Sequence, residues 1–144
     1  MQTSTWVLVA DGAKARLFAM EKDRSLTEIV DFLNPEGRRE RKPLPNRPPR
    51  AHDRFRTSQH AFEPRTTAQE KADDTFAREL DAALERGRVD HRYGDLILVA
   101  PPHFLGALKA ALGEHVRSSV VAELPKDLTQ ADTAEILDHI TAPH

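Results

Sequence analysis

The sequence has 144 residues, which suits one ordinary domain and leaves little room for two. It contains no cysteine, which excludes disulfide frameworks, thiolate zinc sites, iron–sulfur clusters and cysteine nucleophiles. The longest apolar runs, Trp6–Ala10 and Leu96–Pro102, fall far short of the roughly 20 residues of a membrane helix. The first five residues also lack the basic stretch of a signal peptide. We therefore expect a cytoplasmic protein with no membrane partner.

Charge is distributed unevenly along the chain. The 21 Lys and Arg against 23 Asp and Glu give a net charge of −2. Residues 35–65 hold nine basic and four acidic residues, a net charge of +5, which leaves −7 for the remainder. Six of the ten prolines lie in the same stretch. A segment of this composition buries too little apolar surface to fold alone. We predict a long, basic, extended loop at about 35–65, with no regular secondary structure over residues 36–60.

Three strands are predicted before this loop. Trp6–Ala10 is a continuous apolar run of strand length, typical of a strand buried on both faces. Asp11-Gly12 supplies the positive-φ chemistry of a tight hairpin turn. Ala15–Met20 and Leu26–Leu33 follow, and Asn34-Pro35 ends the third strand. Short connections between consecutive strands favour an antiparallel meander.

A helix is predicted after the loop. Apolar residues recur at helical spacing over residues 68–84, with charges between them. Thr66 and Thr67 begin two overlapping capping boxes, and Gly87 is placed to end the helix.

The rest of the chain alternates strands and helices. Asp95–Ala100 reads as a buried strand, and Pro102 suits the first turn of the next helix. Val120–Leu124 makes a further strand, and Thr129-x-x-Asp132 is a capping pattern for a last helix. The order β-β-β-(long basic loop)-α-β-α-β-α implies a single α/β domain over residues 1–144. Its mixed sheet carries helices, in the element order of the ribonuclease H-like fold.

Catalytic motifs are sparse. Ribonuclease H-type chemistry needs clustered carboxylates for two metal ions, but the strand that would present one ends in Ala100-Pro101. We therefore expect no metal site at Asp11 and interpret this residue as part of the turn. The seven histidines show no metal-ligand spacing, and His103 is interpreted as structural. No phosphate-loop or dinucleotide-binding motif occurs, so no cofactor is expected.

The basic loop is the strongest candidate binding segment. Arginine binds phosphate through its charge and planar donor fork, and Phe55, His60 and Phe62 could stack on exposed bases. The alternative interpretation is a solvated loop, or one that docks on an acidic surface of this domain, of a second copy or of a partner protein. The predicted nucleic-acid-binding residues are Arg38, Arg39, Arg41, Lys42, Arg47, Arg50, Arg54 and Arg56.

Five ordered motifs span nearly the whole chain, at residues 10–18, 60–66, 95–102, 105–108 and 126–129. Together they resemble the bacterial host attachment protein family, and the residues that match its motifs include Asp11, Arg16, His60, Glu63 and Arg65. This resemblance implies similarity to the middle domain of archaeo-eukaryotic peptide-chain release factors, a variant of the ribonuclease H-like fold.

The release-factor comparison concerns one loop, in which those factors carry a Gly-Gly-Gln tripeptide. The corresponding residues here are Thr57, Ser58 and Gln59. Without the two glycines the backbone loses conformational freedom, so we favour a binding module for tRNA, rRNA or the ribosome over an enzyme. A peptidyl-tRNA esterase that uses Gln59, with His60 beside it, is the catalytic alternative. A protein–protein adaptor that uses the basic loop, or a homo-oligomer formed through it, is the third.

Overall fold

A computed structural model describes residues 4–36 and 58–141, and the side chains of these residues except 58–67. The described chain forms a five-stranded sheet with helices on both faces. In chain order the elements are β1 (Thr5–Ala10), β2 (Lys14–Met20), β3 (Leu26–Leu33), α3 (Ser58–Val89), β4 (Asp95–Val99), α4 (Pro102–Ala111), α5 (Glu114–Ser119), β5 (Val120–Leu124) and α6 (Thr133–Thr141).

The strand order in the sheet is β3-β2-β1-β4-β5. β2 pairs antiparallel with both β1 and β3, which confirms the predicted meander. β1 pairs parallel with β4, and β4 pairs parallel with β5. As a result β1 lies at the centre, and its residues 6–10 are all buried, as the continuous apolar run predicted.

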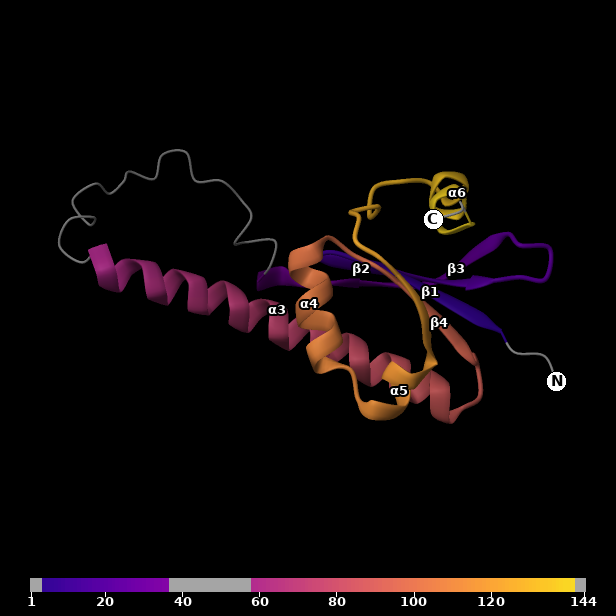
Figure 1. The fold of residues 1–144 in the computed structure, drawn as a ribbon, viewed down its shortest axis with the longest axis horizontal. Helices are drawn as coiled ribbons and strands as arrows, with labels where there is room; N and C mark the ends of the chain where they lie inside the picture. The colour runs from indigo at the N-terminus through magenta and orange to yellow at the C-terminus, as the bar shows by residue number, and fades with distance from the viewer. Residues whose placement is uncertain (1–3, 37–57, 142–144) are drawn as a thin grey trace.

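The two faces of the sheet carry different layers. Figure 1 shows α3, α4 and α5 on one face and α6 on the other. The larger core cluster lies under α3 and α4, with Phe76, Leu80 and Phe104 among its most deeply buried members. The smaller cluster packs Ile136 of α6 against Val7, Val9 and other residues of the opposite face. The mixed α/β class is thus as predicted.

Helix α3 begins earlier than the capping patterns at Thr66 and Thr67 predicted. It starts at Ser58, so residues 58–65 are helical and the prediction of an extended loop over them is wrong. Figure 1 shows the N-terminal end of α3 extending beyond the sheet. A helical turn with no sheet to cover needs no apolar stripe, so hydrophobic periodicity could not reveal it. The rest of the predicted loop, residues 37–57, lies outside the described part of the chain.

Gly87 packs inside α3 rather than ending it. The helix continues to Val89, and a Cβ atom on Gly87 would lie 2.5 Å from Cη2 of Trp6. Trp6 in turn stacks on Tyr93, with 4.6 Å between ring centroids, and the Tyr93 hydroxyl donates to the Leu84 carbonyl. The glycine therefore serves the close approach of the indole to the helix.

Two further details differ from the prediction. A short helix, α5, separates α4 from β5, so the element order contains one helix more than expected. Pro102 does begin α4, as predicted. The last helix, however, starts at Thr133, and its cap is Asp132, whose Oδ1 accepts from the Glu135 N–H at 2.9 Å. Thr129 therefore does not cap α6 and is used elsewhere.

Candidate functional site at the carboxyl end of the sheet

Polar residues gather where the parallel strands β1, β4 and β5 end. Asp11 follows β1, His103 follows β4 and Thr129 lies beyond the end of β5. Parallel neighbouring strands end on the same side of a sheet, and ligands of open α/β sheets bind outside these ends. We call this region the carboxyl end of the sheet.

Asp11 organises the turn between β1 and β2. It is 6% exposed, and its Oδ1 accepts from the Ala13 and Lys14 N–H groups at 2.8 and 2.9 Å. This closes an Asx-type turn by the side chain. The prediction that Asp11 belongs to the turn is confirmed. The prediction of positive φ at Gly12 is wrong, since Gly12 does not adopt a positive φ. The turn is closed instead by the Asp11 side chain, which accepts from the N–H groups of Ala13 and Lys14.

Thr129 connects this turn to the segment after β5. The residue is 2% exposed, and its Oγ1 lies 3.2 Å from Asp11 Oδ2 and 2.8 Å from Asp127 Oδ1. Its backbone N–H also donates to Asp127 Oδ1. A hydroxyl carries one proton and can donate to only one of these carboxylates at a time. The threonine therefore lies between two acidic groups that share its single donor.

Asn34 fixes the end of β3 against the same turn. Its side-chain amide donates to the Gly12 carbonyl at 3.0 Å and to the Ala72 carbonyl of α3 at 3.4 Å. Its backbone N–H donates to the Ala13 carbonyl. The chain is thus held at the carboxyl end of the sheet at Asn34, just after β3 ends.

Asp73 and His103 form a pair between α3 and α4. Asp73 Oδ2 lies 3.0 Å from His103 Nε2, with 8% of the aspartate side chain exposed against 69% of the histidine side chain. A Cβ atom on Gly12 would lie 2.9 Å from Asp73 Oδ1. Gly12 is therefore required for the close approach of this carboxylate to the turn.

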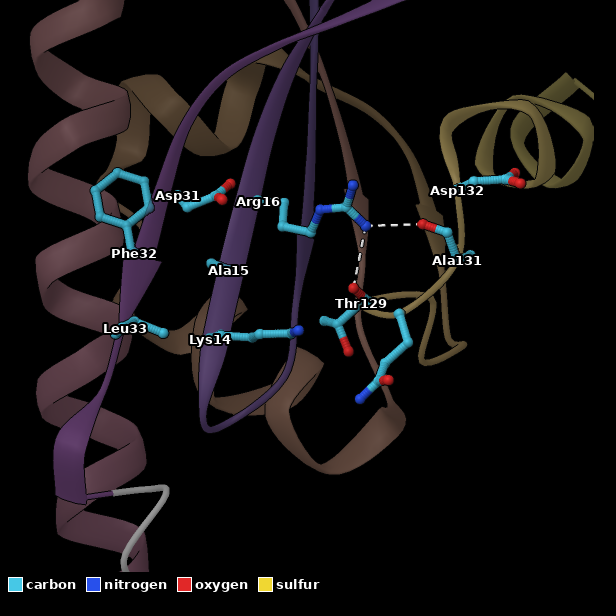
Figure 2. A pocket seen from close by; sticks show the side chains of 10 residues that line it. Lys14, Ala15, Arg16, Asp31, Phe32, Leu33, Thr129, Ala131 and Asp132 are labelled. Atoms are coloured by element: carbon cyan, nitrogen blue, oxygen red, sulfur yellow. Dashed lines mark hydrogen bonds between the residues drawn. The ribbon is translucent and has the colours of Figure 1, made fainter.

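Arg16 of β2 holds the segment between β5 and α6. Its Nη1 donates to the carbonyls of Thr129 and Ala131 at 3.0 and 2.8 Å, as Figure 2 shows. Its Nε and Nη2 donate to the Glu28 carboxylate, and its guanidinium lies over the Phe18 ring at 5.1 Å from the centroid. The guanidinium is therefore largely occupied by contacts within the chain.

The carboxylates beside Arg16 have shifted pKa values in opposite directions. The hydrogen bond from Arg16 lowers the pKa of Glu28. When Asp31 is protonated, it hydrogen-bonds to Glu28. This contact, together with burial, raises the pKa of Asp31.

A cavity of about 480 Å³ opens beside Arg16. Figure 2 shows Lys14 and Arg16 extending from β2 toward the segment around Thr129. Two basic and two acidic residues line the cavity together with apolar groups, so its charges are balanced. The lining residues are Lys14, Ala15, Arg16, Asp31, Phe32, Leu33, Thr129, Gln130, Ala131 and Asp132.

The structure brings two of the five family-motif residues together, since Asp11 and Arg16 both bind Thr129. Gln59 lies in the first turn of α3, not in a loop as the release-factor comparison implied. The side chains of the candidates His60, Glu63 and Arg65 lie outside the described part of the chain. So do the predicted nucleic-acid-binding residues Arg38, Arg39, Arg41, Lys42, Arg47, Arg50, Arg54 and Arg56.

Sequence reasoning did not place Asn34, Asp73 and His103 together in one site. Asn34 was interpreted as a strand breaker, and His103 as a structural residue. Asp73 carried a usable signal, because it precedes Ala77 by four residues and Leu80 by seven and thus lies on the buried face of α3. A carboxylate at such a position requires a polar partner.

Two further features, a metal-binding cluster and a membrane-spanning helix, are absent from the part of the chain that the structure describes. Among residues 4–36 and 68–141, no group of three or more His, Asp or Glu side chains is arranged to hold a metal ion. No helix in the described ranges is both long and apolar enough to cross a membrane.

Comparison with known protein families places the chain in one of them. Curated proteins include none with significant similarity to this chain. A protein-family model described as "protein required for attachment to host cells" matches residues 6–140. The match covers the whole sheet except Thr5, the first residue of β1, and includes Asp11, Asp73, His103 and Thr129. By this match over nearly its whole length, the chain belongs to the host attachment protein family.

Proposed function

We propose that the protein is an RNA-binding module, with tRNA, rRNA or the ribosome as its partner and residues 35–65 as its main contact. The observation that carries this proposal is the charge of that segment, +5 within a chain whose remainder carries −7. Such a concentration of Arg and Lys is the electrostatic footprint of phosphate binding. Asn34 supports the proposal, because its contacts anchor the start of the segment at the carboxyl end of the sheet.

We also infer a ribonuclease H-like fold of the release-factor middle-domain type. The strand order β3-β2-β1-β4-β5, with an antiparallel meander followed by two parallel strands, supports this inference. The esterase alternative receives no comparable support. Gln59 lies in a helix, and the two glycines of the release-factor tripeptide are replaced by Thr57 and Ser58.

The test is the salt dependence of RNA binding. Labelled single-stranded RNA and tRNA are titrated with the protein at several salt concentrations, and affinity is followed by fluorescence anisotropy. A loop variant replaces three arginines and one lysine by glutamine. If all four contact phosphates of a single strand, the slope of log affinity against log salt should flatten by about 2.8, or roughly 0.7 for each contact. The replaced residues are Arg38, Arg39, Arg41 and Lys42.

A matched control removes the same charges from another surface. Three arginines and one lysine that are exposed on and just after α3 are replaced by glutamine, and the slope should then change little. The control residues are Lys71, Arg78, Arg86 and Arg92. Equal slopes for the two variants would show that net charge alone governs binding. A wild-type protein that binds neither RNA at low salt, but captures a protein from its own cells after nuclease treatment, would refute the RNA proposal and favour the adaptor.

A further inference from the structure

The Asp73–His103 pair presents a fixed, exposed imidazole that the contacts of the turn do not use. Asp73 is almost fully buried, whereas 69% of the His103 side chain is exposed. Because Asp73 packs against Gly12 in the turn, its carboxylate is confined. The ring of His103 is therefore held from its Nε2 side, while most of the side chain remains exposed.

This geometry determines which hydrogen bond the neutral ring can offer. An ionised carboxylate only accepts, so with Asp73 ionised a neutral His103 donates from Nε2 to Asp73 Oδ2 across their 3.0 Å contact. In the neutral ring the second nitrogen, Nδ1, then carries a lone pair and no proton. His103 thus presents a hydrogen-bond acceptor to a ligand.

An acceptor distinguishes between the two kinds of nucleic acid backbone. The phosphates and sugar of DNA offer acceptors only, whereas each ribose of RNA has a 2′-hydroxyl that can donate. The location suits such a contact, because Asn34 binds the carbonyl of Ala72, the residue before Asp73. The basic segment therefore starts close to the Asp73–His103 pair.

We propose that His103, positioned by Asp73, accepts a hydrogen bond from a ribose 2′-hydroxyl and gives the protein a preference for RNA over DNA. This inference rests on the proposed function and names the feature of the nucleic acid that the site would recognise. A protonated His103 would instead contact phosphate, which RNA and DNA share, and the two contacts lead to different results in the test below.

The experiment compares wild type and His103→Ala on three oligonucleotides of one sequence, namely RNA, DNA and 2′-O-methyl RNA. We expect His103→Ala to lower affinity for RNA about fivefold, equivalent to about 1 kcal/mol, and to leave affinity for the other two unchanged. The 2′-O-methyl strand keeps the ribose but lacks the hydroxyl proton. His115→Ala is the matched control, because His115 is also exposed, on α5.

Asp73→Asn tests the positioning role. An amide can donate to the ring and favour the other tautomer, so the gap between RNA and 2′-O-methyl RNA should shrink while binding to DNA persists. If this buried substitution prevents folding, His103→Ala decides the question alone.

Three results would overturn the inference. Equal losses on RNA and DNA would assign a phosphate contact to His103, and an unchanged affinity for RNA would assign it no contact. Both leave the proposed function standing. Failure of the wild-type protein to bind RNA at all would refute the proposed function and this inference together.

Discussion

Replacing Arg16 by alanine should detach the segment between β5 and α6 from the sheet. The substitution leaves the carbonyls of Thr129 and Ala131 without the donor that now lies 3.0 and 2.8 Å away. A hydrogen bond with a charged partner contributes about 1.5–3 kcal/mol. The bonds to Glu28 add at most about 1 kcal/mol, because that pair is partly exposed. Water from the adjoining cavity can hydrate the carbonyls in part, so we expect a net loss of about 2–4 kcal/mol.

Urea unfolding measures this loss directly. Trp6 is the single tryptophan and is 6% exposed, so its fluorescence reports unfolding of the core. With a denaturant slope near 2 kcal/mol/M, the midpoint for Arg16→Ala should fall by about 1–2 M. Arg16→Lys keeps the charge but lacks the planar donor fork, so it should recover only a small part of the loss.

The control for this experiment is Arg78→Ala, on the exposed surface of α3. A surface substitution of this kind changes stability by no more than about 0.5 kcal/mol. If Arg16→Ala shifts the midpoint no further than Arg78→Ala, the hydrogen bonds of Arg16 do not hold the C-terminal segment, and the reasoning above is refuted.

Three further predictions concern packing and pH. Gly87→Ala should cost about 1–3 kcal/mol by overpacking and alter Trp6 fluorescence, since the new methyl would meet the indole at 2.5 Å; unchanged stability and emission would contradict the packing role. Asp31→Asn should stabilise the protein slightly at neutral pH. Interaction with Glu28 raises the folded-state pKa of Asp31, so ionisation of Asp31 costs stability as pH rises through that pKa. The advantage of Asp31→Asn over wild type should vanish at about pH 3, where Asp31 is protonated in both the folded and the unfolded state. Burial raises the pKa of Tyr93 to about 12. Because the pKa of tyrosine in the unfolded chain is about 10, the free energy of unfolding should fall as pH rises from about 10 to about 12. The chain has a single tyrosine, so its tyrosinate absorbance can be followed directly, and titration at about pH 10 in the folded protein would contradict this prediction.

The strands could be predicted because their signals are local. A continuous apolar run marked β1, and turn residues marked the ends of β1 and β3. Asp11 was assigned to the correct turn for the same reason, since the backbone N–H groups that donate to its Oδ1 lie within three residues. Local patterns failed for the first turns of α3, which have no apolar stripe beside the sheet.

Sequence patterns could not predict the part of the site that is held together by contacts between residues far apart in the chain. Thr129 looked like a helix cap because its spacing to Asp132 fits one, but its hydroxyl meets Asp11, a residue 118 positions earlier. The pairing of Asp73 with His103 depends on how α3 crosses α4. Such contacts follow from the arrangement of whole elements and leave no spacing rule within either segment.

The contacts of Thr129 and Ala131 have a consequence for the folding order of the chain. They join β2 and its turn to residues more than 110 positions away, so the polypeptide must close a loop of nearly its full length before they form. The smaller core cluster also depends on this closure, because Ile136 covers Val7 and Val9 only when α6 is docked. We therefore expect residues 125–141 to behave as a separate cooperative unit that docks last during folding and opens first in the native protein, which hydrogen exchange would detect.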